Sequence, residues 1–420
     1  MTDLVDYEQL GNIALITMGQ SPAPGSCDDD ERGMPFLQGC AEFGNQHPES
    51  KSFCHTPLKI AKASSTLISV RAPVGTTNRA ERDYCIGRGL AAILARGVTE
   101  NNDFLQYAVE QNVGFLHRRS QGSTFLAISS KDLHQMKVLH PQRVVQDKIA
   151  SILLTSDVAI HRTEALIEKL KQIRSGLMHD LFTRGLDASG RLRPRQYQAP
   201  GLYKQSALGW VPSEWSVTDL GHACEWASGG TPSRQREDWW SGDFPWLTPK
   251  DMKSFELNDT SEHLTEGAAR LGSRVVPAGS VFIVVRGMIL AHTFPVVLSS
   301  RPFAFNQDIK AVRGREGLDN RFLAYWFCAN GQLLLHKVTE ATHGTKRFDL
   351  RDLYKTGISI PRGPEQQEIC RRLDALSSRI EEEGLIAGKS KAMKRGLMQA
   401  LLTGRSLIRV EAPTVESAHV

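Results

Sequence analysis

Cysteine is scarce in this chain and poorly placed for cross-linking. The seven cysteines are an odd number, scattered from Cys27 to Cys370, and no Cys-x-x-Cys pair occurs. This pattern argues against a disulfide framework and against a zinc site, and it fits a reducing compartment. We therefore expect the protein to act in the cytoplasm.

Long apolar runs are lacking as well. No stretch approaches the roughly 18 apolar residues that a membrane helix needs. The opening residues MTDLVDYEQL contain acidic residues and no apolar signal core. The sequence therefore predicts no membrane partner and no secretory signal. The composition, 40% hydrophobic and 23% charged over 420 residues, is that of a globular protein with about two to four domains.

Catalytic motifs are missing too. No Pro-Pro pair occurs, so the Asn/Asp-Pro-Pro-Tyr loop of an adenine methyltransferase is absent, and so is a Gly-rich cofactor turn. The 13 histidines show no metal-binding spacing. GLIAGKS (384–390) is one residue short of a phosphate-binding loop and lies in a helical pattern, so we interpret it as solvated helix. The sequence predicts no catalytic residue, metal or cofactor in this chain.

Positive charge is local rather than general. The formal net charge is +5, but residues 1–140 carry 13 Lys/Arg against 15 Asp/Glu, and residues 211–360 carry 17 of each. The excess lies in residues 141–210, with 11 against 6. Any contact with nucleic acid must therefore depend on small clusters within the two large blocks.

What the sequence does contain is an internal repeat. A shift of 220 residues aligns SGLMHDLFT (175–183) with RGLMQALLT (395–403), and it also aligns Gln146 with Gln366. A shift of 210 aligns PFL (35–37) with PWL (245–247). The chain is thus two copies of one unit, in which a block is followed by a second, shorter segment.

The blocks have a mixed α/β pattern. Short β-prone runs such as LISVRAPVG (67–75) and GSVFIVVRG (279–287) are bounded by Gly, Pro and Ser, which is typical of strands with irregular loops. FLQYAVEQN (104–112) and FLAYWFCAN (322–330) predict one short helix in each copy.

The shorter segments are predicted to be long helices. Residues 145–183 contain no Pro and a single Gly, and such a segment would extend about 58 Å as one helix. A helix this long with one apolar stripe needs a partner, and we expect the other copy to be that partner. The expected heptad seam comprises Ile149, Ile152, Ser156, Ala159, Thr163, Leu166, Leu170, Ile173 and Leu177.

The predicted fold is therefore two similar mixed α/β domains separated by two long antiparallel helices, which form a coiled-coil spacer with a pseudo-twofold axis. The expected boundaries are 1–140 and 211–360 for the domains, 141–185 and 361–405 for the spacer helices, 186–210 for a linker and 406–420 for a tail. The residues expected to pack the helices or to dock a partner are Ile149, Leu153, Leu170, Leu177, Met178, Leu181, Ile369, Leu373, Leu397, Met398 and Leu401.

An ordered set of segments resembles the specificity subunit of type I restriction–modification enzymes. Each segment alone is weak, but together they cover nearly the whole chain in two copies. GQSP (19–22) in the first copy stands where the second has Gly-Gly-Thr-Pro, which indicates a different specificity. The segments are LISVRAPVG (67–75), CIGRGLAAI (85–93), SEWSVTDLGHACEWASGGTPS (213–233), FPWLTPKDM (244–252), FNQDIKAV (305–312), THGTKRFDLRDL (342–353) and the IP-x-x-x-E-Q-Q-E-I opening of the second helix (360–369).

The resemblance implies a division of labour. Each block would be a target-recognition domain that reads one half of a split target in double-stranded DNA. The two helices would set the gap and dock two modification subunits, which would bring S-adenosylmethionine and methylate adenine. Restriction subunits would bring ATP- and Mg-dependent translocation and cleavage. This chain would be non-catalytic and would hold no cofactor.

Candidate DNA contacts lie in polar, Gly-containing loops, because their residue types bind base edges or phosphates. Two basic loops, 117–124 and 342–347, lie just before an Asp-Leu pair in each copy. Arg71 and Arg286 could instead be structural arginines at strand ends. The candidates are Arg71, Thr76, Thr77, Asn78, Arg79, Arg88, Arg118, Arg119, Gln121 and Ser123 in the first copy, and Thr231, Ser233, Arg234, Thr248, Lys250, Arg286, His343, Thr345, Lys346 and Arg347 in the second.

Two other interpretations stay open. The chain could be a standalone DNA methyltransferase or nuclease whose motifs are not recognisable in the sequence. It could also be a coiled-coil scaffold that joins two protein-binding domains and never meets DNA. The near-neutral blocks keep this second alternative open, since phosphate contacts supply most non-specific affinity for DNA.

Overall fold

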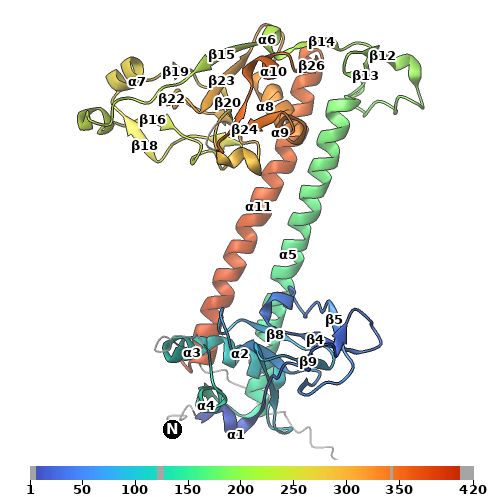
Figure 1. The fold of residues 1–420 in the computed structure, drawn as a ribbon, viewed down its shortest axis with the longest axis vertical. Coiled ribbons are helices and arrows are strands. Elements are labelled where there is room, and N and C mark those ends of the chain that lie inside the picture. Colours follow the sequence, from blue (N-terminus) through green and yellow to red (C-terminus); the bar gives the residue numbers. More distant parts are fainter. Residues whose placement is uncertain (1–5, 121–126, 341–343, 407–420) are drawn as a thin grey trace, which may run out of the picture. The chain divides into compact units, whose positions relative to one another are not determined.

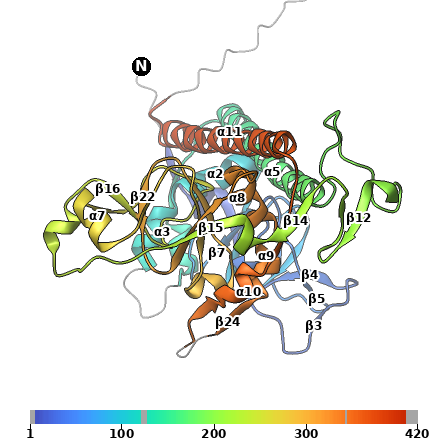
Figure 2. The same ribbon diagram turned by 90° about the horizontal axis from the view of Figure 1, so that it is seen from above.

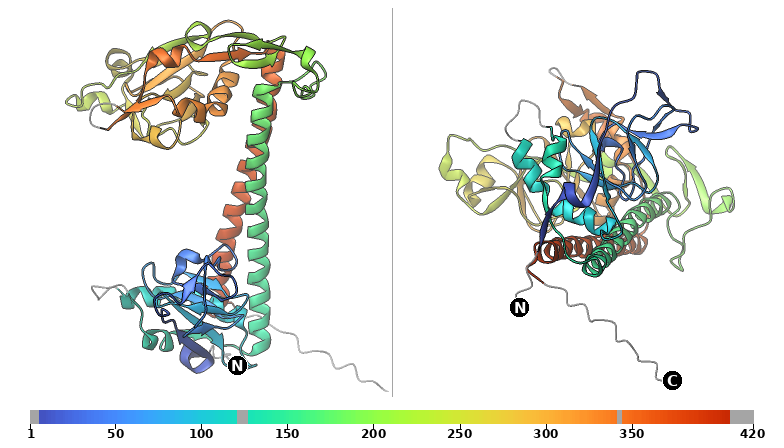
Figure 3. Two further views of the ribbon diagram at one scale, coloured as in Figure 1. Left: turned by 45° about the vertical axis from the view of Figure 1, so that its right-hand side comes forward. Right: turned by 90° about the horizontal axis from the view of Figure 1, so that it is seen from below.

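The computed structural model describes residues 6–120, 127–340 and 344–406. They fall into two compact units: unit 1 contains the described residues up to Ala165 and from Glu383 onward, and unit 2 is Leu166–Glu382. Helices α5 (Arg143–Thr183) and α11 (Gly363–Leu402) each contribute to both units (Figure 1). Each is continuous (Figure 3), which confirms the predicted long helices.

Unit 1 contains three sheets within its described residues. A four-stranded antiparallel sheet has the order β2-β10-β7-β8, and a five-stranded sheet has the order β3-β5-β4-β9-β6, in which β4 and β9 run parallel. The strands are β1 (Tyr7–Gln9), which pairs with β11 (Lys137–Leu139), β2 (Ala14–Met18), β3 (Cys27–Asp28), β4 (Met34–Leu37), β5 (Ser52–Cys54), β6 (Ile60–Ala61), β7 (Thr66–Ser69), β8 (Thr77–Arg79), β9 (Tyr84–Ile86) and β10 (Leu90–Ala95).

Short helices connect these strands. The helix α2 begins at an Asn101 cap, whose side chain accepts a hydrogen bond from the Phe104 N–H and so satisfies one of the unpaired donors of the first turn. The helices of unit 1 besides the long ones are α1 (Leu10–Ile13), the 3-10 turn η1 (Cys40–Glu42), α2 (Asn102–Gln111), α3 (Val113–Ser120) and α4 (Ser130–His134).

Unit 2 is built in the same way. Its described residues form a five-stranded sheet in the order β15-β23-β20-β21-β17 and a four-stranded sheet in the order β18-β16-β22-β19. The strands of unit 2 are β12 (Tyr203–Ser206), β13 (Gly209–Pro212), β14 (Ser216–Asp219), β15 (Cys224–Ser228), β16 (Phe244–Leu247), β17 (Glu256–Leu257), β18 (Glu262–Leu264), β19 (Val275–Val276), β20 (Val281–Val284), β21 (Val296–Ser299), β22 (Phe303–Phe305), β23 (Ile309–Gly314), β24 (Val338–Glu340), β25 (Lys346–Phe348) and β26 (Gly357–Ile360).

Its short helices recur in the same order as those of unit 1. The helix α8 also begins at a capping side chain, Asp319, which accepts from the Phe322 N–H. The helices of unit 2 besides the long ones are α6 (Leu220–Ala223), α7 (Glu266–Gly272), α8 (Asn320–Ala329), α9 (Gly331–Leu335), α10 (Leu350–Tyr354) and the 3-10 turns η2 (Pro200–Leu202), η3 (Glu237–Trp240) and η4 (Met288–Ala291).

The repeat extends to strand order and register. The order β2-β10-β7-β8 of unit 1 recurs as β15-β23-β20-β21 in unit 2, and β5-β4-β9-β6 recurs as β18-β16-β22-β19. In the parallel pairs, Phe36 lies opposite Cys85 in unit 1 and Trp246 lies opposite Ala304 in unit 2. The prediction of two similar mixed α/β domains is confirmed.

Both ends of the long helices are built into domain cores. In unit 1, Ile149 and Leu153 near the start of α5 are buried in one cluster with Leu401 and Leu402 at the end of α11. In unit 2, Leu181 at the end of α5 is buried with Ile369 and Leu373 at the start of α11. The start of one helix therefore lies beside the end of the other within each unit, as expected for an antiparallel pair.

This arrangement explains the repeated Gly-Leu-Met phrase. Leu177 and Met178 pack against the core of unit 2, and Leu397 and Met398 pack against the core of unit 1. Each phrase lies where a long helix reaches the domain of the other copy, so both copies need the same apolar side chains at the same turn.

The expected heptad seam is wrong in the middle of α5. Ala159 is exposed, and Leu166 and Ile173 are 39% and 47% exposed, whereas Ile160 is only 6% exposed. Leu170 is half-buried. A straight helix drifts by about 20° per heptad from a strict 3.5-residue repeat, so a seam drawn over several heptads rotates away from the partner.

Polar contacts join the helices where the apolar seam fails. In unit 1, Lys394 Nζ lies 2.6 Å from Asp157 Oδ1, and Lys391 Nζ lies 2.6 Å from Glu164 Oε1. In unit 2, Arg174 Nη1 donates to Ser377 Oγ at 3.3 Å. The middle of the spacer is therefore held by ionic and polar pairs rather than by a continuous apolar stripe.

A buried glutamine fastens the first turn of each long helix to its domain. In unit 1, Gln146 accepts from the Asn101 N–H at 2.9 Å and donates to the Pro141 carbonyl at 2.8 Å. In unit 2, Gln366 accepts from the Asp319 N–H at 2.8 Å and donates to the Pro361 and Gly317 carbonyls at 2.8 and 2.7 Å.

A tyrosine adds a second tie, about three turns beyond the glutamine in α5 and about two turns beyond it in α11. The Tyr107 hydroxyl donates to Asp157 at 2.5 Å in unit 1, and the Tyr325 hydroxyl donates to Asp374 at 2.6 Å in unit 2. Burial and the neighbouring carboxylate raise the pKa of both tyrosines. Both hydroxyls therefore stay protonated and keep donating over the whole physiological pH range.

The two ends of the segment between α5 and β14 lie against each other, at Gly185 and Trp215. A Cβ atom on Gly185, which has φ +63°, would lie 2.4 Å from the Trp215 ring. Arg193 Nη1 lies 2.6 Å from Glu365 Oε1 with side chains only 7% and 12% exposed, and the Trp215 Nε1 donates to the same carboxylate. Between these anchors, β12 and β13 form a hairpin (Figure 2), which begins within the expected linker 186–210 and ends at Pro212.

None of the helices among the described residues is long and apolar enough to span a membrane.

The glutamine ties give a first prediction. Gln366→Leu would leave the Asp319 N–H and two carbonyls without partners in a buried site, which costs about 2–4 kcal/mol. We expect the melting transition of unit 2 to fall by roughly 5–15 °C in calorimetry. Gln205→Leu, at an exposed position of the β12–β13 hairpin, is the matched control and should leave the transition unchanged. Equal transitions for both variants would contradict the assigned role.

Candidate nucleic-acid interface

In unit 2, several candidate residues gather around the turn between β22 and β23. The Ile309 N–H donates to the Asn306 carbonyl at 3.4 Å to close the turn, and the Asn306 N–H donates to the Leu247 carbonyl at 3.0 Å. Gln307 at the tip is exposed, and its Oε1 accepts from the Thr231 hydroxyl at 2.6 Å. The turn is thus held by backbone bonds and leaves one amide side chain at the surface.

Arginine and lysine side chains border this turn. Arg286 donates through Nε to Asp308 Oδ1 at 2.6 Å, and its backbone forms an isolated β-bridge with Arg347. Lys346 lies one residue earlier and pairs with Glu340 at 2.7 Å. The structure therefore brings Thr231, Arg286, Lys346 and Arg347 into one region. Thr231 contacts Gln307, Arg286 contacts Asp308, and Arg347 pairs with Arg286. Thr345 precedes them and is half-buried.

Unit 1 contains the same turn between β9 and β10. The Leu90 N–H donates to the Gly87 carbonyl at 3.0 Å, and the Gly87 N–H donates to the Leu37 carbonyl at 2.8 Å. Arg88 at the tip is exposed, and its backbone N–H lies 3.5 Å from the Ser21 hydroxyl. Arg71 forms an isolated bridge with Ala127, which matches the bridge between Arg286 and Arg347 in unit 2.

The two turns differ in charge. Gly89 in unit 1 occupies the position of Asp308 in unit 2, and Arg71 occupies the position of Arg286. Arg286 is neutralised by Asp308, whereas no described carboxylate forms an ion pair with Arg71 or Arg88. The turn of unit 1 therefore presents more unbalanced positive charge than the turn of unit 2.

The side chains of β8 contact other residues within unit 1. The Thr77 hydroxyl donates to Glu110 at 2.9 Å, and Asn78 is only 6% exposed and donates to the Gly44 carbonyl at 2.8 Å. Arg79 pairs with Asp103, and burial lowers the pKa of its guanidinium. These three side chains bind the domain together, while Thr76 beside them is exposed.

The first basic loop begins at the end of α3. Arg118 and Arg119 are exposed there, and Arg119 stacks over Phe115 at 5.1 Å with its Nη1 3.9 Å from Asp132 Oδ1. Three further candidates, Gln121, Ser123 and His343, lie outside the described residues. The α3 arginines therefore remain surface cations near the start of α4.

Arg234 is engaged in a structural contact rather than left free. Its guanidinium forms two hydrogen bonds to Glu262, at 2.6 and 3.1 Å, and lies 3.5 Å from the ring centroid of Trp240. Trp246 is only 3% exposed, and Trp240 packs against the same small core. Trp246 is therefore a core residue, Trp240 packs against it, and Arg234 covers both rings.

The remaining candidates of unit 2 are divided. Thr248 is only 8% exposed and donates to Asp251 at 2.7 Å, so it shapes its own loop. Ser233 and Lys250 are exposed, and no described carboxylate pairs with Lys250.

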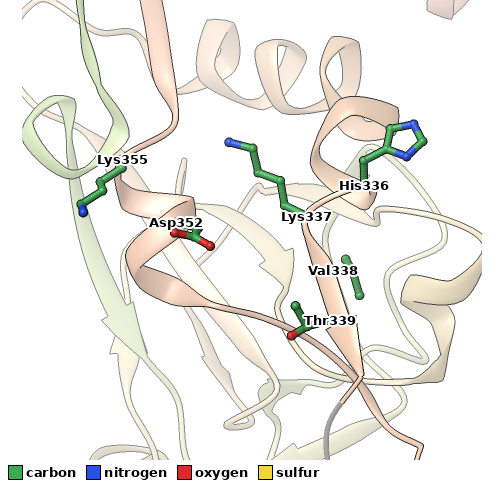
Figure 4. Close-up of a pocket in the computed structure, with 6 residues that line it drawn as sticks. All are labelled: His336, Lys337, Val338, Thr339, Asp352 and Lys355. Atoms are coloured by element: carbon green, nitrogen blue, oxygen red, sulfur yellow. The ribbon is translucent and has the colours of Figure 1, made fainter.

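A polar pocket in unit 2 was missed by the sequence. It has a volume of about 420 Å³ and lies between α9, β24 and α10 (Figure 4). Figure 4 shows Lys337 extending toward the side that carries Asp352, and its Nζ donates to the Thr356 hydroxyl at 2.9 Å. The lining residues are His336, Lys337, Val338, Thr339, Asp352 and Lys355.

Gln307 was also missed, although the sequence held a signal for it. FNQDIKAV (305–312) and CIGRGLAAI (85–93) each precede or enter an apolar strand, and aligning them at a shift of 219 sets Gln307 against Arg88. The structure confirms this equivalence through the shared turn. Lys337 carried no comparable signal, because its pocket depends on how α9 and α10 pack.

No group of three His, Cys, Asp or Glu side chains in the described part of the chain is arranged to hold a metal ion. GLIAGKS (384–390) lies inside α11, which agrees with its interpretation as helix.

Comparisons with known proteins agree with the repeated architecture. Residues 5–172 and 212–387 each match the model of the type I restriction modification DNA specificity domain. A putative type I restriction enzyme MjaX specificity subunit from Methanocaldococcus jannaschii is 38% identical over 182 residues, which is 42% of this chain and 43% of that protein. The EcoR124I/EcoR124II specificity subunit from Escherichia coli is 31% identical over 206 residues, 48% of this chain and 50% of that protein.

The fold has a relative among solved structures. The crystal structure of the S subunit of a type I restriction–modification system from M. genitalium matches with a TM-score of 0.59 at 13% identity, over 96% of this chain and 97% of that one. The match shows a shared fold over nearly the whole length. The aligned segments of the two curated relatives, by contrast, span half of those proteins or less.

The contacts of Arg234 give a second prediction. Arg234→Lys would lose the paired hydrogen bonds to Glu262 and the stacking on Trp240. Because the side chain is half exposed, we expect a cost of only about 1 kcal/mol, seen as a fall of about 2–4 °C in the melting transition of unit 2. Arg274→Lys, at an exposed position of unit 2, is the control and should not change it. An unchanged transition with weakened DNA binding would instead make Arg234 a DNA contact.

Proposed function

The chain belongs to the type I restriction–modification DNA specificity family, whose domain it contains twice, and on this premise we propose that it is the DNA-recognition subunit of a type I restriction–modification complex. Each domain would read one half of a split, asymmetric target. The chain itself would perform no catalysis.

One observation carries this proposal. The two units share strand order, register and the closing hydrogen bonds of an exposed turn, yet they present different side chains at its tip, Arg88 and Gln307. A common frame with different surface residues is what reading two different half-sites requires, because direct readout depends on the donors and acceptors that reach the base edges.

The proposed parts follow the repeat. Residues 1–140 and 211–360 would be the target-recognition domains, joined by the linker 186–210. Residues 141–185 and 361–405 would form the spacer that fixes the distance between the half-sites. From the predicted contacts we keep Arg71, Arg88, Thr231, Arg286 and Arg347 as the core of the interface. Thr76, Arg118, Arg119, Ser233, Lys250, Thr345 and Lys346 would contact DNA around it.

The partners would supply the chemistry. Two modification subunits would dock on the spacer helices and methylate adenine with S-adenosylmethionine. Restriction subunits would add translocation and cleavage that depend on ATP and Mg. Exposed apolar side chains on α11, Leu385, Ile386 and Met393 at 68%, 47% and 62% exposure, support a protein partner on this helix, because large exposed apolar groups mark contact surfaces.

The two alternatives make different predictions. A standalone methyltransferase would transfer methyl groups from S-adenosylmethionine to DNA without any partner. A scaffold unrelated to DNA would assemble with its partners and leave no DNA footprint. Neither alternative has a specific observation in its favour.

The central prediction is a split recognition sequence. The chain, its modification subunit, S-adenosylmethionine and a random duplex library are mixed, and the methylated pool is sequenced. We expect two short adenine-containing halves separated by a fixed gap. The chain alone with S-adenosylmethionine is the control and should yield no methylation. A stable complex that enriches no sequence would overturn the proposed function.

A further prediction concerns affinity. Because the two blocks are close to neutral, we expect the isolated chain to bind duplex DNA more weakly than the assembled complex. The magnitude of its log–log salt slope should also be smaller, since each phosphate that a protein neutralises adds about 0.9 to that magnitude. The modification subunits would neutralise the remaining phosphates. Equal affinity and equal salt slopes for the chain and the complex would contradict this division.

A further inference from the structure

The residue at the tip of the shared turn differs between the two units, and this difference bears on how each unit selects its half of the DNA target. The turn closes with the same backbone bonds in both units, from Leu90 to Gly87 and from Ile309 to Asn306. A second bond anchors it to the parallel strand, at Leu37 in unit 1 and Leu247 in unit 2. One residue, Arg88 or Gln307, stands at the equivalent exposed position.

The residues on both sides of each tip residue are held by close contacts. In unit 1, Cβ atoms at Gly87 and Gly89 would approach atoms of Gln38 to 2.6 and 2.5 Å, so the turn lies directly on that loop. In unit 2, the equivalent Asn306 and Asp308 brace each other through hydrogen bonds of 3.1 and 3.2 Å. A rigid base that carries one exposed side chain is the arrangement that positions a recognition group with little loss of freedom on binding.

The two side chains are chemically suited to different bases. The Arg88 guanidinium makes no hydrogen bond or ion pair within the described residues and carries parallel N–H donors, which match the two acceptors O6 and N7 of guanine. The Gln307 amide offers one donor and one acceptor, which match N7 and N6 of adenine. Its Oε1 already accepts from Thr231, which orients the amide and leaves a second lone pair for a base.

The neighbouring charges agree with this difference. Arg71 beside the turn of unit 1 has no ion-pair partner within the described residues, whereas Arg286 beside the turn of unit 2 is paired with Asp308 at 2.6 Å. The first turn therefore favours the electron-rich edge of guanine, and the second turn presents an almost neutral surface.

We propose that Arg88 reads a guanine in one half of the target and that Gln307, at the equivalent position of the other unit, reads an adenine in the other half. This inference rests on the proposed function. It adds that one exposed turn residue in each unit determines the preferred base pair at one position, and that the two residues are exchangeable because their frames are the same.

The test uses the full chain assembled with its modification subunit. Methylated pools from the random library are compared for the wild type, Arg88→Gln, Gln307→Arg and the double variant. We expect Arg88→Gln to change one position of one half from G·C to A·T, and Gln307→Arg to make the reverse change in the other half. The preference for the old base over the new one should shift by roughly 10- to 100-fold.

Several outcomes would overturn the inference. A motif that stays unchanged in both variants would exclude base reading by these residues. Methylation that falls equally on all sequences with an unchanged motif would make them phosphate contacts. If Arg88→Gln abolishes methylation altogether, Arg88→Lys decides: a restored, unchanged motif would mark a phosphate contact, and a restored but relaxed preference at one position would mark a base contact.

Controls separate this inference from the proposed function. Arg32→Gln in unit 1 and Gln205→Arg in unit 2 change exposed side chains away from the turn and should leave the motif intact. Calorimetry should show equal melting transitions for all variants. Absence of any split motif in the wild-type pool would sink the proposed function, whereas a wild-type motif that both variants keep would sink only the reading by Arg88 and Gln307.

Discussion

The rest of the structure depends on two buried glutamines. Gln146 and Gln366 each join the first turn of a long helix to the cap of a short helix and to the chain that precedes it. An amide has one strong acceptor and two donors, so it can satisfy backbone groups on both sides of the joint at once. Without these ties, the first turn of each helix would be held by apolar packing, which fixes burial but not direction, and the directional contacts would begin only at the tyrosine hydrogen bonds further along the helix. Any function that relies on the helix as a spacer relies on these amides.

The cores add a second constraint. Each domain core is completed by the beginning of its own helix and by the end of the other copy's helix, through Leu401 and Leu402 in unit 1 and Leu181 in unit 2. Neither copy buries its apolar surface alone. The spacer is therefore part of both hydrophobic cores, and substitutions at Leu177 or Leu397 act on domain stability as well as on the helix pair.

The sequence predicted what depends on periodicity and repetition. Two alignable copies, with no Pro in residues 145–183 of the first, were sufficient for the long helices, and the Gly-bounded apolar runs were sufficient for strands such as β7 and β20. The predictions failed where a side chain's partner is distant in the chain. The ion pair of Arg234 with Glu262, the burial of Asn78 against Gly44 and the turn of Leu166 and Ile173 toward solvent all depend on packing that no local pattern encodes. Gln307 was accessible in principle, because the repeat places it opposite Arg88.

The segment between α5 and β14 begins and ends at the same place, and it joins the two copies there. Gly185 and Trp215 touch, and Arg193 and Glu365 are buried together beside them, so the path between these points does not bridge any distance. The number of residues in this segment therefore does not affect the contacts at its two ends. The entropic cost of closing the loop also depends only weakly on that number. The end of the first copy and the start of the second therefore meet at Gly185 and Trp215. The β12–β13 hairpin projects from this junction. An inserted peptide or a label at the Ala207 turn would lengthen this hairpin and leave the contacts of Gly185, Trp215, Arg193 and Glu365 unchanged.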